Sequence, residues 1–371
     1  MKYYFIAGEA SGDLHASNMI KALRKQQSEA EIRAWGGDLM QEAGAEIVKH
    51  YRDLAFMGFV EVLMNIRTIL SNLKLCKKDI LDYNPEVLVL VDYPGFNLRI
   101  AEWAKQRGIK VLYYISPQIW AWKQSRVHKI KRDVGRMLTI LPFEKDFYAS
   151  FNFEVDFVGH PLLDAIKDRP EVKRDEGLAN LGIDKSQGPL VAILPGSRKQ
   201  EIKTMLPLML QTVRARKVNY VIAGAPSQDL SFYQEVSGET DLPILFGKTY
   251  DLLELADAAL VTSGTATLET ALFKVPEVVC YKGSAISYQI AKRLVKVKYI
   301  SLVNLVMDRM VVKELIQSDY KLENVLKELD YCLSEEGKNK LHADYLELEQ
   351  KLGGTGASDR AAEILIDYAQ S

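Results

Sequence analysis

The chain has few of the residues that cross-link a protein or bind metal. Its three cysteines, Cys76, Cys280 and Cys332, lie far apart and form no paired motif, its five histidines are scattered, and no Asp-x-Asp pair occurs. These absences argue against a disulfide framework and a structural zinc site. We therefore expect a reduced, cytoplasmic protein that needs no metal and no cofactor.

Long apolar runs and an excess of one charge are also missing. The 48 basic and 49 acidic side chains nearly cancel, so nothing global predicts a nucleic-acid partner. No uncharged apolar run reaches the ~18 residues that span a bilayer, and Met1-Lys2 leads straight into an expected strand rather than a signal peptide. We expect a protein that is not integral to a membrane but can still lie on its surface.

The 371 residues are too many for one ordinary core, and strands alternate with helices along them. Runs such as 87–91, VLVLV, are typical of central strands in a parallel sheet covered on both faces, and short loops indicate doubly wound α/β domains. We expect a first domain at 1–165 and a second at 166–345. The expected strands are 3–7, 31–35, 86–91, 110–115, 134–141 and 155–158 in the first, and 190–194, 219–223, 243–246, 258–261 and 277–280 in the second.

Residues 189–201, PLVAILPGSRKQE, predict a buried strand, a tight turn and the start of a helix. Such a turn leaves backbone N–H groups pointing outward at the positive end of the helix dipole, which suits an anion. Gly196 lets the backbone approach a ligand, Ser197 can bond a phosphate oxygen, and Arg198 adds a charged fork. A phosphate site and an ordinary capped turn both fit these residues.

A second strand, turn and helix of this kind follows at 258–269, AALVTSGTATLE. Ser263, Gly264 and Thr265 offer hydroxyls and backbone amides for phosphate. Glu269 lies one turn into the helix, where a carboxylate suits ribose hydroxyls better than phosphate. Two anion turns and a ribose acceptor in one domain predict a site for a nucleoside diphosphate.

The first domain carries carboxylates where the second carries phosphate-binding groups. The turn 8–13, GEASGD, contains Glu9, Ser11 and Asp13, which would repel phosphate and predict contacts to sugar hydroxyls; the alternative is that Asp13 or Ser11 caps the helix. Asp92 directly follows the buried strand 87–91. There it can act as a general base with a raised pKa, or it can cap the helix that begins near Pro94.

Residues 54–75, LAFMGFVEVLMNIRTILSNLKL, carry more large apolar side chains than one helix needs to dock on a sheet. A buried helix hairpin and a lipid-facing surface both explain them, and the lysines that follow favour anionic lipid. The candidate acyl and membrane contacts are Phe56, Met57, Phe59, Val60, Leu63, Met64, Ile66 and Leu70.

Residues 116–122, SPQIWAW, end another expected strand, and Trp120 and Trp122 can stack on a sugar or pack below it. The acid-free run that follows is typical of a solvated helix face but also fits an anionic membrane or an anionic substrate. The run consists of Lys123, Arg126, Lys129, Lys131 and Arg132.

Taken together, these motifs resemble those of the lipid-A-disaccharide synthase family over nearly the whole chain and in the family's order. The motifs are GEASGD at 8–13, FMGFVEVL at 56–63, SPQIWAW at 116–122, LPFE at 141–144, GHPL at 159–162, LPGSR at 194–198, SGTATLE at 263–269 and SL-x-NL at 301–305.

The resemblance implies a GT-B fold, in which two Rossmann-like domains face a central cleft and C-terminal helices, here 346–371, return to the N-terminal domain. It implies an inverting glycosyltransferase that joins UDP-2,3-diacylglucosamine to 2,3-diacylglucosamine 1-phosphate (lipid X), forming a β(1→6) disaccharide and UDP. It also implies peripheral attachment to phospholipid on the cytoplasmic face of the inner membrane and a homodimer with exchanged C-terminal segments.

Residue by residue, the resemblance implies that Asp92 is the general base, Arg198 binds the diphosphate and Glu269 binds ribose. Asn304 matches the asparagine of the family's late motif and is the remaining candidate for a sugar contact. The chain departs from the pattern at Gly95, where the family usually has aspartate, and at Val303, where it has proline. Two alternatives are an enzyme like the UDP-N-acetylglucosamine 2-epimerases and a non-enzymatic module that binds a UDP-sugar at a membrane.

Overall fold

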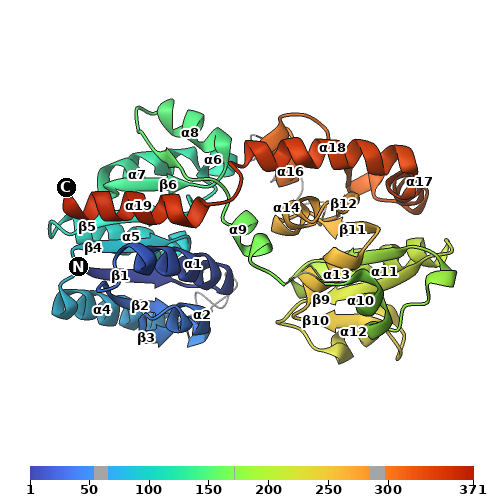
Figure 1. Cartoon of the computed structure of the whole chain (residues 1–371), viewed down its shortest axis with the longest axis horizontal. Coiled ribbons are helices and arrows are strands. Elements are labelled where there is room, and N and C mark those ends of the chain that lie inside the picture. Colours follow the sequence, from blue (N-terminus) through green and yellow to red (C-terminus); the bar gives the residue numbers. More distant parts are fainter. Residues whose placement is uncertain (54–65, 171, 285–296) are drawn as a thin grey trace. The chain divides into compact units, whose positions relative to one another are not determined.

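The computed structural model describes residues 1–53, 66–170, 172–284 and 297–371 (Figure 1). The chain divides into two compact units: the first contains Met1–Lys167 and Leu352–Ser371, and the second contains Asp168–Lys351. The boundaries expected from the sequence, 165/166 and 345/346, lie two and six residues before those of the structure, 167/168 and 351/352.

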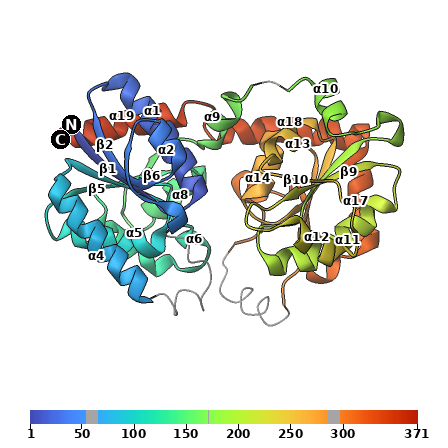
Figure 2. The same ribbon diagram turned by 90° about the horizontal axis from the view of Figure 1, so that it is seen from below.

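The first unit is built on a parallel sheet of seven strands in the order β3-β2-β1-β4-β5-β6-β7. Helices cover both faces of this sheet (Figure 2). The strands are β1 Lys2–Ala7, β2 Glu31–Gly36, β3 Glu46–His50, β4 Val87–Val91, β5 Lys110–Tyr114, β6 Arg136–Thr139 and β7 Asp156–Phe157. The helices are α1 Ala10–Gln26, α2 Asp38–Glu42, α4 Ile66–Tyr83, α5 Pro94–Lys105, α6 Ile119–Trp122, α7 Val127–Asp133, α8 Pro142–Ala149, α9 Leu162–Lys167 and α19 Ala357–Gln370.

Strand β4 shows why the sheet is buried on both sides. Its side chains alternate between two cores: Val87, Val89 and Val91 pack on the face of α1 and α19, and Leu88 and Leu90 pack on the face of α4 and α5. All five are fully buried. The expected central strand with two covered faces is confirmed, and the carboxyl end of β4 therefore opens at the edge where α/β sheets bind ligands.

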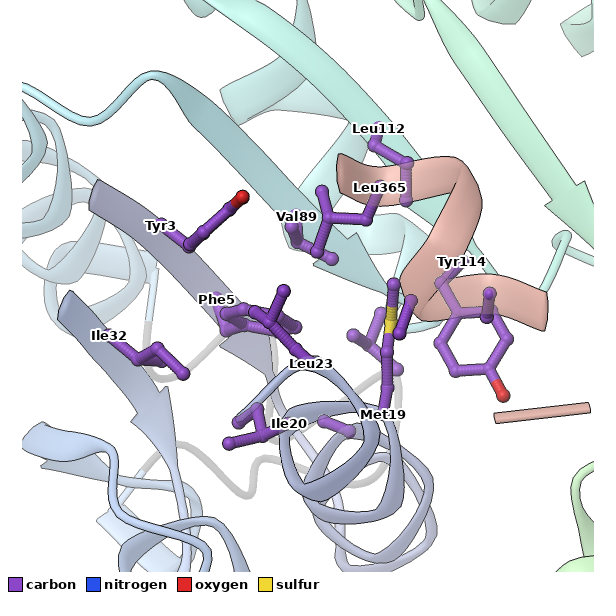
Figure 3. Packing of buried hydrophobic residues seen from close by; sticks show 14 of the residues in the cluster. Tyr3, Phe5, Met19, Ile20, Leu23, Ile32, Val89, Leu112, Tyr114 and Leu365 are labelled. Atoms are coloured by element: carbon purple, nitrogen blue, oxygen red, sulfur yellow. The ribbon is translucent and has the colours of Figure 1, made fainter. Parts of the chain in front are cut away.

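The C-terminal helix α19 belongs to the first unit although it follows the whole second unit in sequence. It packs beside α1, and Leu365 lies beside Val89 and Leu112 in the core (Figure 3). Ala361 is also fully buried. The expected return of the C-terminal segment to the N-terminal domain is thus confirmed for α19 within one chain, whereas residues 346–351 belong to the second unit.

The second unit has a parallel sheet of six strands in the order β10-β9-β8-β11-β12-β13, so β8 and β11 are neighbours. The strands are β8 Leu190–Leu194, β9 Asn219–Gly224, β10 Ile244–Phe246, β11 Ala258–Thr262, β12 Glu277–Tyr281 and β13 Lys313–Ile316. The helices are α10 Arg174–Asn180, α11 Lys199–Arg214, α12 Leu230–Ser237, α13 Thr249–Leu255, α14 Thr265–Leu272, α16 Leu302–Met307, α17 Leu322–Leu333 and α18 Glu335–Lys351. Two doubly wound units give the expected fold class.

Candidate active site

In the first unit, the backbone is strained where β4 and β5 end. Asp92 and Tyr93 have positive φ angles of 43° and 49°, and Ile115 has one of 67°. Residues other than glycine rarely adopt this left-handed conformation, and a β-branched residue such as Ile115 does so least readily. Since β4 and β5 pair side by side, the strained residues share one edge of the sheet. Strain of this kind persists where surrounding contacts impose it, and it concentrates at functional sites.

Two buried side chains impose the conformation of Asp92. The amide Nδ2 of Asn97, a residue with no exposed surface, donates to the backbone oxygens of Asp92 at 2.8 Å, Val91 at 3.2 Å and Ile6 at 3.4 Å. The hydroxyl of Tyr113 donates to the same Asp92 oxygen at 2.5 Å. Neither residue stands out in the sequence as a site residue. Asn97 could be noticed in the sequence because it follows Asp92 by only five positions. Tyr113, in contrast, is brought to Asp92 only by the pairing of β5 with β4.

The Asp92 carboxyl holds its proton more tightly than an ordinary aspartate. Burial raises its pKa from 3.8 to about 6, the negative charge of Glu9 adds to the rise, and a hydrogen bond from the Tyr93 N–H opposes it. A base with a pKa near the working pH is well suited to accept a proton in a reaction. Asp92 does not cap α5, because Tyr93 is the N-cap residue and no side chain makes a capping bond there.

The glycine turn after β1 packs against the Asp92 turn. A Cβ atom on Gly8 would lie 2.4 Å from Cγ of Tyr93, so only glycine allows the tyrosine ring to rest on this backbone. Glu9 is the N-cap residue of α1 and Ser11 lies in the first turn of that helix, and both are exposed. The two predicted sugar contacts therefore follow directly after a glycine that touches the turn of the predicted base.

Asp13, the third predicted sugar contact of residues 8–13, lies inside α1 and has a different environment. It is 2% exposed, and its carboxylate accepts the backbone N–H groups of Gly37 at 2.7 Å, Leu39 at 3.1 Å and Met40 at 3.2 Å. It therefore caps α2 rather than its own helix. The predicted direct sugar contact of Asp13 becomes, in our interpretation, a positioning role that fixes the start of α1 against α2.

Removing the Asn97 amide is expected to destabilise the first unit. Asn97→Ala leaves three buried carbonyl oxygens without this donor, which should lower the free energy of unfolding by about 2–4 kcal/mol in urea denaturation. Gly95→Ala, in the same helix, is the matched control, because no atom lies within 4 Å of a Cβ placed there. That control should be neutral or stabilising by up to about 1 kcal/mol. Equal stability of the two variants would show that Asn97 does not hold the turn.

In the second unit, the two predicted anion turns lie side by side because β8 and β11 are neighbours. Gly196 has a φ of 108°, and a Cβ on it would lie 3.5 Å from Cγ2 of Thr262 and 2.9 Å from a carboxylate oxygen of Glu201. The helices α11 and α14 begin directly after these turns, so both helix N-termini lie at the same edge of the sheet.

A carboxylate of the chain itself occupies the first anion turn. An oxygen of Glu201 accepts the backbone N–H groups of Ser197 and Arg198, both at 3.3 Å, and the other oxygen accepts Nη1 of Arg198 at 3.1 Å. The Arg198 side chain is 80% exposed. The predicted donors thus bind a negative group of the chain itself, and their use by a diphosphate stays a prediction. The sequence signal for Glu201 is its place three residues after the N-cap residue Arg198, as in a capping box.

The second anion turn is tied to a loop near its strand end. The Ser263 hydroxyl donates to the carbonyl of Ile300 at 3.0 Å, while Gly264 and Thr265 are exposed. Glu269 accepts a hydrogen bond from the Tyr250 hydroxyl at 3.3 Å, and burial raises the pKa of Glu269. Tyr250, which the sequence does not single out, therefore orients the predicted ribose acceptor.

Asn304 has no exposed surface and uses its side chain internally. Its Nδ2 donates to Glu314 and to the carbonyl of Val312, both at 2.9 Å, and its Oδ1 accepts the N–H groups of Val311 at 2.7 Å and Val312 at 3.0 Å. Glu314 also accepts the N–H of Ile300, the residue that anchors Ser263. Asn304 therefore holds a loop of the site, and we replace the direct sugar contact predicted for it by this positioning role.

Most of the predicted acyl contacts, namely Phe56, Met57, Phe59, Val60, Leu63 and Met64, lie outside the described residues. Ile66 begins α4, and Leu70 on the same helix is 57% exposed. Among the described residues, no helix is long and apolar enough to cross a bilayer, and no cluster of three His, Cys, Asp or Glu side chains could hold a metal ion.

Comparison with solved structures identifies the class of fold. The chain superposes on a glycosyltransferase of kitacinnamycin with a TM-score of 0.65 at 12% identity, covering 99% of both chains. It superposes on a putative UDP-N-acetylglucosamine 2-epimerase from Listeria monocytogenes with a TM-score of 0.65 at 13% identity, covering 98% of this chain and 94% of the other. At such identities the likeness concerns the fold alone, which is the GT-B fold.

Comparison of sequences then separates the two kinds of enzyme. The family model for lipid-A-disaccharide synthetase matches residues 3–366. The chain is 40% identical to the lipid-A-disaccharide synthase of Syntrophus aciditrophicus over 370 residues (97% of this chain, 96% of the other), and 38% identical to that of Trichlorobacter lovleyi over 374 residues (98% and 97%). The chain belongs to the lipid-A-disaccharide synthase family. It is therefore a hexosyltransferase, and the epimerase alternative is not favoured.

Proposed function

We propose that the protein transfers 2,3-diacylglucosamine from its UDP conjugate to the 6-hydroxyl of 2,3-diacylglucosamine 1-phosphate, with inversion at the anomeric carbon. The observation that carries this proposal is the Asp92 carboxyl, held at a strained strand end with a pKa of about 6, in a chain of this family. The second unit would bind UDP through Gly196, Ser197, Arg198, Ser263, Gly264, Thr265 and Glu269. The first unit would bind the acceptor sugar beside Glu9 and Ser11.

The proposed reaction forms one bond and breaks one. The acceptor oxygen attacks the anomeric carbon of the donor as Asp92 removes its proton, and the bond from that carbon to the diphosphate oxygen breaks. UDP leaves with the bonding electrons, so negative charge grows on the diphosphate. Arg198 and the N–H groups of the two turns suit this charge better in the transition state than in the ground state.

The membrane contact in this proposal is supported by the outer face of α4. Leu70 and Leu75 are 57% and 47% exposed, and Lys74 and Lys78 are exposed beside them. Exposed leucines flanked by lysines suit an interface with anionic phospholipid, and we propose that this helix lies on the cytoplasmic face of the inner membrane. The proposed homodimer with exchanged C-terminal segments is supported only by the resemblance to the family.

The function is tested by following UDP release from UDP-2,3-diacylglucosamine in detergent micelles, with and without 2,3-diacylglucosamine 1-phosphate. We expect release that depends on the acceptor and a disaccharide product with a β(1→6) bond. Turnover of UDP-N-acetylglucosamine without an acceptor would instead indicate an epimerase. Binding of UDP-sugar with no turnover of either would indicate a non-enzymatic module.

A further inference from the structure

A tryptophan and two cations gather on the loop that follows β5 in the first unit. Trp122, at the end of α6, is 51% exposed. The ammonium of Lys123 lies 4.6 Å from the centre of its ring, and the guanidinium carbon of Arg126 lies 5.6 Å from it. Two positive charges therefore lie against one exposed aromatic ring.

These two cations lack the acidic partners that their neighbours have. On α7, Lys129 pairs with Glu102 at 2.7 Å, and Arg132 pairs with both Glu102 and Asp133. Within the described part of the chain, neither Lys123 nor Arg126 forms an ion pair or donates a side-chain hydrogen bond to an acid. Among the same residues, Lys131 also lacks an acid and bonds only the carbonyl of Phe151. Lys123 and Arg126 are therefore distinguished by the aromatic ring that they share, which places two available charges at one spot.

The loop is held rigidly by buried contacts beneath it. The indole N–H of Trp120 donates to Glu144 at 3.2 Å, and the Gln124 amide donates to the Trp120 carbonyl at 3.1 Å. Glu144 is 1% exposed and also accepts the Leu141 N–H at 3.0 Å. The cations are thus mounted on a preformed loop, which lowers the entropy cost of binding a ligand.

The same loop follows β5, which pairs with β4, and so begins at the sheet edge where the Asp92 turn lies. The hydroxyl of Tyr113 on β5 donates to the Asp92 carbonyl at 2.5 Å. Burial raises the pKa of Tyr113 well above its ordinary value, the Asp92 charge raises it further, and the positive charge of Arg126 opposes both. Asp92 directly follows β4, and the loop that carries Arg126 follows the adjacent strand β5.

We propose that Arg126 and Lys123 form a binding site for the phosphate monoester of the sugar acceptor, with the Trp122 ring as its apolar wall. This proposal rests on the proposed function and adds to it the feature that distinguishes the acceptor from the donor. A guanidinium fork binds phosphate oxygens in pairs, and the lysine adds a second charge. Holding the phosphate here would bring a hydroxyl elsewhere on the sugar towards Asp92.

The test compares acceptors with and without the phosphate. We expect Arg126→Gln to raise KM for 2,3-diacylglucosamine 1-phosphate by ~10- to 50-fold, the range of a lost charge-assisted hydrogen bond, with KM for the UDP donor unchanged. The dephosphorylated acceptor should react equally poorly with wild type and variant. Lys131→Gln is the matched control, since its ammonium only bonds the Phe151 carbonyl at 3.2 Å, and it should change neither value.

A second experiment measures acceptor binding directly and does not depend on turnover. Binding of the phosphorylated acceptor in neutral detergent micelles, without donor, should weaken in Arg126→Gln by a similar factor. Equal loss with both acceptors would overturn the proposal and indicate a general effect on the loop. Unchanged acceptor binding with weaker attachment to phosphatidylglycerol vesicles would overturn it in favour of a lipid headgroup. If the wild type shows no turnover but still binds the phosphorylated acceptor more tightly than Arg126→Gln does, the result would contradict the proposed function and leave the phosphate site supported.

Discussion

Asp92→Asn is expected to lower kcat by ~10²- to 10⁴-fold, the contribution of a positioned general base, while UDP binding is retained. The asparagine keeps the size of the side chain and tolerates the φ of 43° better than most residues. It also keeps the backbone oxygen that Asn97 and Tyr113 bind. The variant therefore removes the base without removing the turn. In the wild type, kcat/KM should fall tenfold per pH unit below about pH 6, where Asp92 becomes protonated.

The same substitution should stabilise the fold at neutral pH. Because the folded-state pKa of about 6 lies above the ordinary value of 3.8, ionised Asp92 opposes folding at pH 7 by at most about 3 kcal/mol. Asn carries no charge to desolvate, so urea denaturation at pH 7 should show a more stable variant. The gain should shrink as pH falls from about 6 towards 3.8, because the folded state then takes up a proton that the unfolded state still lacks, and it should vanish below 3.8, where Asp92 is protonated in both states.

Either half of this prediction can fail independently. A variant that keeps more than a tenth of wild-type kcat would show that another group removes the proton. A variant that loses both activity and stability would show that Asp92 supports the fold rather than opposing it. Stability gained at the cost of activity is the outcome expected of a residue kept for chemistry.

The central strands could be predicted from the sequence because their residues are apolar without interruption. Strand β8 matches the expected 190–194, and β4 differs by one residue at its start. Two of the four edge strands of the described sheets, β3 and β13, were not expected. Glu46–His50 and Lys313–Ile316 mix charged with apolar residues, since an edge strand has one open side and little need for a continuous apolar run. Their assignment depends on the neighbouring strand, which local sequence does not specify.

The sequence predicted where the site residues lie along the strands and turns, but not which groups their side chains contact. Asp92 could be placed at a strand end from the run of five apolar residues before it, and that is where it lies. Asp13 and Asn304 carry the right chemistry for a sugar, yet their partners are backbone groups 24 to 27 and 7 to 8 residues away along the chain. Whether a polar side chain faces a ligand or another loop is decided by tertiary packing, which a single sequence does not reveal.

The anion turn of the second unit gives the other large expected effect. Arg198→Ala should lower kcat/KM for the UDP donor by ~10²- to 10³-fold, as the loss of one group that stabilises transition-state charge does. Its pair with Glu201 is largely exposed, so the free energy of unfolding should change by less than about 1 kcal/mol. Arg198→Lys keeps the charge without the fork and should lie between the two. Lys203→Ala, one turn further along α11, is the control and should retain donor kinetics.

Glu201 provides the opposite arm of this experiment, because its carboxylate holds the N–H groups that a diphosphate would need. Glu201→Gln removes a negative charge from that place while keeping a hydrogen-bond acceptor, so UDP should bind several-fold more tightly as measured by calorimetry. Arg198→Ala and Glu201→Gln should therefore move UDP affinity in opposite directions. If both variants weaken UDP binding alike, Glu201 supports the ligand indirectly, through the loop that it caps. If neither variant changes the affinity for UDP, the diphosphate binds elsewhere, since an anion held at this turn must respond to both charges.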